Sequence, residues 1–173
     1  MQNRFRKYLP FLTVVLIVLL DQLTKYWAVS FLLPGGEIEV IPNVFYLNFA
    51  TNNGAAWSML AGRRVILLLV TVLALALILV VLKKGWVNTK LGRCGVYFVL
   101  GGAIGNFLDR AFRASGRVVD LFDFRLINFP IFNVADVFIT VGGVLFGLFV
   151  LQTALQDRKE RKSGDGDGDS HAD

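Results

Sequence analysis

The sequence predicts an all-α polytopic membrane protein with four transmembrane helices, and its composition is the first reason. Of the 173 residues, 55% are hydrophobic, and the mean hydropathy of +0.59 is high for a soluble domain of this length. In addition, four apolar segments approach the roughly 20 residues that a spanning helix needs. They cover residues 10–29, 65–82, 91–111 and 133–155. We therefore expect one membrane-embedded domain over residues 1–157.

The first segment, residues 10–29, has two interpretations: a cleaved signal peptide or a retained helix. Basic residues precede it, and "AVS" (28–30) resembles a small-x-small cleavage site. However, Asp21 and Lys25 lie between the apolar run and that site, and their spacing lets them pair on one helix face. We favour a retained helix that carries an intramembrane ion pair.

The other three segments differ in how clearly they predict a span. Residues 65–82 contain no charge and are the clearest case. Residues 91–111 are the least apolar, and their glycines at 101, 102 and 105 predict close packing against a neighbouring helix. Residues 133–155 begin with Asn133 and Asp136, which fit a helix N-cap and its capping box.

The basic residues predict an orientation. Eleven Lys and Arg residues flank the ends that would share one side of the membrane, which favours four spans with both termini in the cytoplasm. Six arginines would then face outward, which weakens the rule and indicates that some have local tasks. These are Arg63, Arg64, Arg110, Arg113, Arg117 and Arg125.

Two outer loops and a tail complete the chain. The loop 30–64 contains β-branched and aromatic runs bounded by Pro and Gly, which predict short strands. The loop 112–132 joins the third and fourth spans. Residues 158–173 form a charged, low-complexity tail that we expect to be disordered.

The scarcity of two residue types excludes several chemistries. The only cysteine is Cys94, and the only histidine, His171, lies in the tail. We therefore expect no internal disulfide, no Cys- or His-ligated metal and no histidine base. Lys and Arg cluster at the ends of apolar runs rather than in a basic stripe, so we expect no nucleic-acid partner.

Polar residues gather near the outer ends of the predicted spans, where ionisable groups are costly and usually functional. Three interpretations are open: an ion relay of a transporter, a structural scaffold, or a carboxylate pair that does chemistry. Two neighbouring aspartates cannot both ionise easily, so one holds a proton while the other acts as a base. Asp120, just before the loop, and Asp136, one turn into the fourth span, could converge at the interface as such a pair, whereas Asp123 is either solvated or paired with Arg125.

Supporting roles are expected for other polar residues in the spans. Asp109 and Arg110 are adjacent and are interpreted as a structural ion pair, with Asn106 one turn earlier as a hydrogen-bonding link between helices.

Five sequence blocks over roughly residues 10–155 resemble the lipoprotein signal peptidase, or type II signal peptidase, family of bacteria. They are "DQLTKYWA" (21–28), "NNGAAWS" (52–58), "GGAIGNFLDR" (101–110), "GRVVDLFDF" (116–124) and "FPIFNVADVFITVG" (129–142). The chain departs from the family pattern at Leu121 and Trp57, where phenylalanine is common. Both positions remain apolar, so the resemblance holds.

This resemblance implies an intramembrane aspartic endopeptidase that cuts a prolipoprotein just before its diacylglyceryl cysteine. It assigns catalysis to Asp120 and Asp136 and makes Asp123 a bystander. The positions that match the family's supporting residues are Asp21, Lys25, Asn52, Gly54, Asn106, Asp109, Arg110, Asn133 and Ala135.

The resemblance also implies a fold and a location. A small extracytoplasmic β-cradle would come from the first outer loop, and a helix-bearing part of residues 35–62 would cover the site. The expected location is the bacterial cytoplasmic membrane, with the active site near its outer face. We expect no cofactor and no metal, diacylglyceryl prolipoproteins and membrane lipids as partners, and a monomer.

Overall fold

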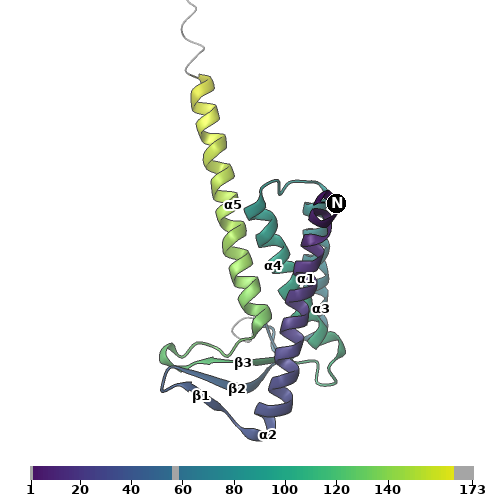
Figure 1. Cartoon of the computed structure of the whole chain (residues 1–173), viewed down its shortest axis with the longest axis vertical. Coiled ribbons are helices and arrows are strands. Elements are labelled where there is room, and N and C mark those ends of the chain that lie inside the picture. The colour runs from purple at the N-terminus through teal and green to yellow at the C-terminus, as the bar shows by residue number, and fades with distance from the viewer. Residues whose placement is uncertain (1, 56–58, 166–173) are drawn as a thin grey trace, which may run out of the picture.

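In a computed structural model, which describes residues 2–55 and 59–165, four long helices run side by side (Figure 1). Each contains a stretch that is long and apolar enough to cross a membrane, as predicted. These helices are α1 (Gln2–Trp27), α3 (Arg64–Lys83), α4 (Lys90–Phe112) and α5 (Val134–Asp165).

The first span is longer than the sequence predicted. A π-helical turn, η1 (Ala28–Leu32), and the short α2 (Leu33–Gly35) continue α1 without a break, so the apolar span covers Leu9–Gly35. It stops at Gly36, whose φ of 84° is one that glycine adopts at little cost. The "AVS" stretch therefore lies inside a continuous helix.

The last helix also runs past its predicted end. α5 continues to Asp165, into the segment from residue 158 that we expected to be disordered. Two physical reasons account for the difference. Gln, Arg, Lys and Glu are good helix formers, and extending an existing helix avoids the cost of nucleation. Residues 166–173 lie outside the described residues.

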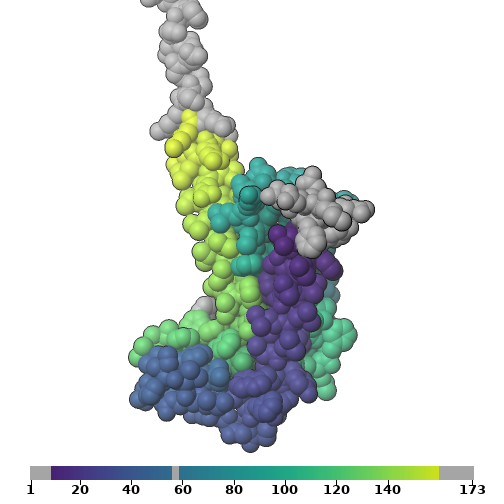
Figure 2. Space-filling view, in the orientation of Figure 1, coloured from purple at the N-terminus to yellow at the C-terminus, as the bar shows by residue number. Residues whose placement is uncertain are grey.

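A small antiparallel sheet projects to one side of the bundle, beneath the start of α5 (Figures 1 and 2). Its strands lie in the order β1 (Ile38–Ile41), β2 (Phe45–Asn52) and β3 (Val118–Phe124). The short strands expected in the first outer loop are thus present as β1 and β2. In the described part of residues 53–62 the backbone forms turns and bends, so no helix covers the site there.

β3 is a strand that the sequence did not predict, because it comes from the loop 112–132. Its residues are mostly buried, so they do not alternate between apolar and polar as a half-buried strand would. β3 pairs with β2, and this pairing sets Ala50 opposite Asp120. The β-cradle is therefore built from both connecting loops.

Glycines let α4 pack closely against its neighbours. A Cβ added to Gly95 would lie 2.7 Å from the Gly142 carbonyl oxygen, and one added to Gly142 would lie 2.6 Å from that of Gly95. A Cβ on Gly101 would lie 2.9 Å from Ile17, and one on Gly105 would lie 2.5 Å from the Asp21 carboxylate. The close contact predicted for this glycine-rich helix is confirmed.

Candidate active site

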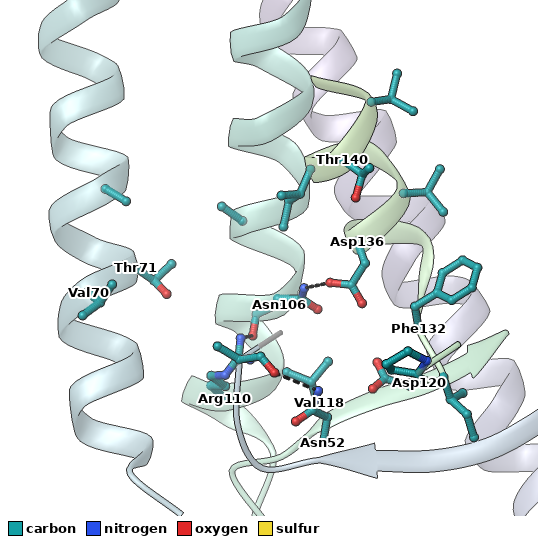
Figure 3. A pocket seen from close by; sticks show the side chains of 18 of the residues that line it. Asn52, Val70, Thr71, Asn106, Arg110, Val118, Asp120, Phe132, Asp136 and Thr140 are labelled. Atoms are coloured by element: carbon teal, nitrogen blue, oxygen red, sulfur yellow. Dashed lines mark hydrogen bonds between the residues drawn. The ribbon is translucent and has the colours of Figure 1, made fainter. Parts of the chain in front are cut away.

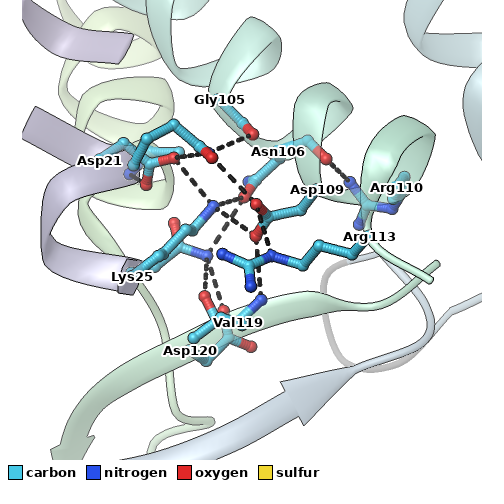
Figure 4. A network of polar contacts seen from close by, with 12 residues as sticks. Asp21, Lys25, Gly105, Asn106, Asp109, Arg110, Arg113, Val119 and Asp120 are labelled. Atoms are coloured by element: carbon cyan, nitrogen blue, oxygen red, sulfur yellow. Dashed lines mark hydrogen bonds and ion pairs between the residues drawn. The ribbon is translucent and has the colours of Figure 1, made fainter. Parts of the chain in front are cut away.

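A cluster of buried charges joins α1 to α4 (Figure 4). Asp21 and Lys25 are fully buried, and Asp109 is 1% exposed. The Lys25 Nζ atom lies 2.9 Å from Asp21 Oδ2 and 3.1 Å from Asp109 Oδ2, and it donates to Asn106 Oδ1 at 2.9 Å. All three ammonium protons thus have acceptors. The predicted Asp21–Lys25 pair is confirmed.

The two carboxylates of this cluster also hold backbone groups. Asp21 Oδ1 accepts a hydrogen bond from the Ala135 N–H at 2.9 Å, and Asp109 Oδ2 accepts one from the Val119 N–H at 3.1 Å. Ala135 lies in the first turn of α5 and Val119 lies in β3. The buried charges therefore fix the start of α5 and the start of β3 relative to α1 and α4.

The predicted ion pair between Asp109 and Arg110 is wrong. Asp109 pairs with Lys25 and with Arg113, whose Nε lies 2.9 Å from Asp109 Oδ1. Arg110 instead donates to the Gly54 carbonyl at 2.6 Å. Adjacent helix residues do not face each other, whereas residues four apart do. Arg110 thus ties the loop after β2 to α4.

Asp136 is held in the first turn of α5 by a reciprocal capping box with Asn133. The Asp136 N–H donates to Asn133 Oδ1 at 3.0 Å, and the Asn133 N–H donates to Asp136 Oδ2 at 3.3 Å. The predicted cap is therefore present. Asn106 adds a further bond, because its Nδ2 donates to Asp136 Oδ1 at 2.8 Å.

Asp120 lies in β3 and is 3% exposed. The Asn133 Nδ2 group donates to Asp120 Oδ1 at 2.6 Å and to the Val119 carbonyl at 3.3 Å. Burial, together with the neighbouring charge of Asp136, raises the pKa of Asp120 to about 7. Near neutral pH this carboxyl can therefore hold or release a proton.

Asp120 and Asp136 line the same cavity of about 620 Å³ (Figure 3). The cavity lies between α3 and α5, with α4 behind it, and its walls are largely apolar. Polar groups gather at the end near the sheet, namely Asn52, Asn106, Arg110, Asp120 and Asp136. A mostly apolar cavity with a few convergent polar groups is typical of a binding or catalytic site.

Asp123 lies away from this cavity. It follows Asp120 by three positions in β3, and an odd spacing in a strand directs two side chains to opposite faces. Its Oδ2 atom is 2.9 Å from Arg125 Nε and accepts a hydrogen bond from Asn48 Nδ2 at 3.2 Å. Of the two interpretations of Asp123, solvated or paired, the structure shows the pairing with Arg125.

The remaining predicted site residues surround these groups. Asn52 and Gly54 form a turn in which the Gly54 N–H donates to Asn52 Oδ1 at 2.8 Å. Within residues 2–55 and 59–165, no group of three or more His, Cys, Asp or Glu side chains is placed to hold a metal ion. The two cavity aspartates contact amide donors instead.

The sequence did not predict two residues near the site, Gln22 and Arg113. Gln22 Nε2 donates to Asp109 Oδ1 at 3.2 Å and to the Gly105 carbonyl at 3.2 Å, so it bridges α1 and α4. Arg113 pairs with Asp109. The four-residue spacing of Asp109 and Arg113 was a signal that could have identified the second of these.

The chain resembles known proteins in sequence and in structure. A family model described as signal peptidase (SPase) II matches residues 13–152. A lipoprotein signal peptidase of Brevibacillus brevis is 41% identical over 152 residues, which cover 87% of this chain and 98% of the relative. Another, of Geobacillus kaustophilus, is 43% identical over 136 residues, which cover 78% of this chain and 86% of the relative.

Two solved structures share the fold. Both are described as bacterial membrane enzyme structures obtained by the in meso method, at 2.3 and 1.9 Å resolution. The first has a TM-score of 0.75 and 28% identity, and the match covers 95% of this chain and 93% of that one. The second has a TM-score of 0.73 and 33% identity, with coverage of 82% and 92%.

Proposed function

The chain belongs to the signal peptidase II family, and we propose that it removes signal peptides from diacylglyceryl-modified prolipoproteins by an aspartic mechanism. Membership of this family makes it a protease of prolipoproteins. The cut would fall just before the lipidated cysteine. The observation that carries the aspartic mechanism is the placement of Asp120 and Asp136 in one cavity, joined through the side chain of Asn133.

The two carboxyl groups can perform the whole reaction with one shared proton. One aspartate takes a proton from water while the water oxygen attacks the peptide carbonyl carbon, and the other gives its proton to the carbonyl oxygen. The first aspartate then passes its proton to the leaving nitrogen as the carbon–nitrogen bond breaks. A hydroxyl proton of the intermediate returns to the second aspartate. The products are an acid and an amine, and the two aspartates, which we call the dyad, regain their original protonation states.

The cavity suits a substrate that arrives within the membrane. Its walls near α3 and α5 are apolar. Leu67 is the one described residue of α3 that is buried, so the rest of that helix is at least partly exposed. A signal helix could therefore lie against α3 and α5 while the acyl chains stay in lipid. Asn52 and Arg110 line the polar end of the cavity and could supply hydrogen-bond donors to substrate carbonyls.

We infer an orientation in which the sheet and the dyad lie at the outer face of the bacterial cytoplasmic membrane. Four spans then place both termini in the cytoplasm, as the basic residues favour. Four of the six outward arginines have local partners, which supports this orientation. They are Arg64, Arg110, Arg113 and Arg125.

Cleavage in reconstituted vesicles tests the proposal. The substrate is a diacylglyceryl prolipoprotein, and mass spectrometry identifies a product that begins at the lipidated cysteine. We expect Asp120→Asn and Asp136→Asn each to lower the rate by about 10²- to 10⁴-fold, because each removes an acid–base group. Asp123→Asn is the matched control and should keep activity, since Asp123 lies outside the cavity.

Three outcomes would contradict the proposal. Near-normal cleavage by Asp120→Asn or Asp136→Asn would exclude the dyad. Loss of cleavage in Asp123→Asn alone would mean that Asp123, and not Asp120, is the catalytic carboxylate of this segment. Ion flux through wild-type vesicles without any cleavage would favour a transporter.

A further inference from the structure

The side-chain amide of Asn106 has only one orientation that satisfies its neighbours. Its oxygen faces Lys25 Nζ at 2.9 Å and Asn133 Nδ2 at 3.2 Å, and an ammonium group can only donate. The Asn106 Nδ2 group must therefore point the other way, where it donates to Asp136 Oδ1 at 2.8 Å. Lys25 thus determines that the Nδ2 end of the Asn106 amide faces Asp136.

The amide of Asn133 is fixed in the same way, by backbone groups. Its oxygen accepts from the Asp136 N–H at 3.0 Å, and its Nδ2 donates to the Val119 carbonyl at 3.3 Å. An N–H can only donate and a carbonyl can only accept, so the two ends cannot be exchanged. The Nδ2 group consequently also faces Asp120 Oδ1, at 2.6 Å.

Because these amides are fixed, the two aspartates accept different numbers of hydrogen bonds. Asp136 accepts two hydrogen bonds from described residues, one on each oxygen, from Asn106 Nδ2 and from the Asn133 N–H. Asp120 accepts one, on Oδ1. Hydrogen bonds to a carboxylate favour its charged form, whereas burial disfavours it. The negative charge is therefore better stabilised on Asp136.

The charges around the cavity support one ionised member of the pair. The surrounding cations are Lys25 of α1 and Arg110 and Arg113 of α4. The surrounding carboxylates are Asp21 of α1 and Asp109 of α4. With Asp136 ionised and Asp120 protonated, three positive charges face three negative ones, and a second charge in the pair would be uncompensated.

We propose that Lys25 is a positioning residue of the dyad: through Asn106 it directs an amide donor to Asp136, so that Asp136 is the base and Asp120 holds the proton. This inference rests on the proposed function. In the first step Asp136 accepts the proton of the attacking water, and Asp120 donates its proton to the peptide carbonyl oxygen. Lys25 touches neither reacting group.

The pH dependence of cleavage tests this role in the full chain. Lys25→Met removes the ammonium that orients Asn106, and Asn106→Leu removes the amide but leaves the ammonium in place. Each should lower kcat by about 100-fold with little change in KM, because the base is misplaced rather than the substrate lost. Each should also move the acidic limb of the kcat profile to higher pH by about one unit.

The double variant distinguishes an effect of Lys25 that acts through Asn106 from a direct effect of the Lys25 charge. If Lys25 acts through Asn106, the double variant should shift the limb no further than either single change. A limb at its wild-type pH in Asn106→Leu, or a double shift equal to the sum of the two single shifts, would overturn the inference. So would a lower kcat with an unchanged profile in both variants, which is the result of a purely structural role.

An infrared measurement locates the proton even if Lys25→Met fails to fold. At pH 6 the band of a protonated carboxyl group should be lost in Asp120→Asn and kept in Asp136→Asn. The reverse result would overturn the inference. Failure of the proposed function is distinct from either outcome, because it would appear as near-normal cleavage in the two aspartate variants.

Discussion

Replacing Asp120 by asparagine should stabilise the folded protein while it removes activity. Asp120 is 3% exposed, and its burial raises the pKa from an ordinary value near 3.8 to about 7. Asparagine has nearly the same shape, and its oxygen can still accept the hydrogen bond from Asn133. The substitution thus removes a costly ionisation and keeps the packing. Stability traded for activity in this way is common at active sites.

The size and the pH range of the gain follow from proton linkage. Because the folded pKa of Asp120 lies above its unfolded value, the folded state binds more protons, and stability falls as the pH rises from about 4 to about 7. The difference is about three pH units, and each is worth about 1.4 kcal/mol. Asp120→Asn should therefore gain on the order of 4 kcal/mol above pH 7, and nothing below about pH 4.

Thermal unfolding of the purified protein in detergent measures this gain. The Tm of Asp120→Asn should exceed that of the wild type by about 8–16 °C at pH 8, and the difference should shrink as the pH falls. Asp123→Asn is the control, because Asp123 is paired with Arg125 and should gain nothing. A Tm for Asp120→Asn that equals or falls below the wild-type value at pH 8 would refute the reasoning.

Three further predictions concern the frame around the site. Gly142→Ala should cost about 1–3 kcal/mol in detergent unfolding, because its Cβ would meet the Gly95 carbonyl at 2.6 Å, whereas Gly143→Ala, with nothing within 4 Å, should be tolerated. Arg64→Ala should lower stability by about 1 kcal/mol, since Arg64 Nε donates to the Arg110 carbonyl at the end of α4 at 2.6 Å; an unchanged Tm would contradict this. The Arg125 guanidinium lowers the pKa of Glu37, so Glu37→Gln should lower the Tm at pH 7, and the difference should vanish as the pH falls through that pKa.

The helices could be predicted from the sequence because they depend on local properties. Apolar length predicted four spans, and the spacing of Asp21 and Lys25 predicted their pairing. The capping box of Asn133 and Asp136 was equally local, since both residues lie within one turn. The resemblance to a family then assigned catalysis to Asp120 and Asp136, a pairing that local spacing alone permitted without proving.

The contacts that the sequence did not reveal are long-range ones. β3 depends on pairing with β2, about seventy residues earlier in the chain, so its two aspartates resembled those of a polar loop. The partners of Asp109 were misjudged because Lys25 comes from another helix. The asymmetry that we propose for Asp120 and Asp136 depends on two amide orientations, which require contacts among α1, α4, β3 and α5.

The claim that Asp120 and Asp136 act as one catalytic unit is tested by comparing both single asparagine variants with the double variant. Residues that act as a unit are strongly non-additive, because removing either one disables both. We predict that the double variant cleaves diacylglyceryl prolipoprotein at the same residual rate as the slower single variant. A double variant slower by the product of the two single effects, or near-normal cleavage in either single variant, would contradict the shared role.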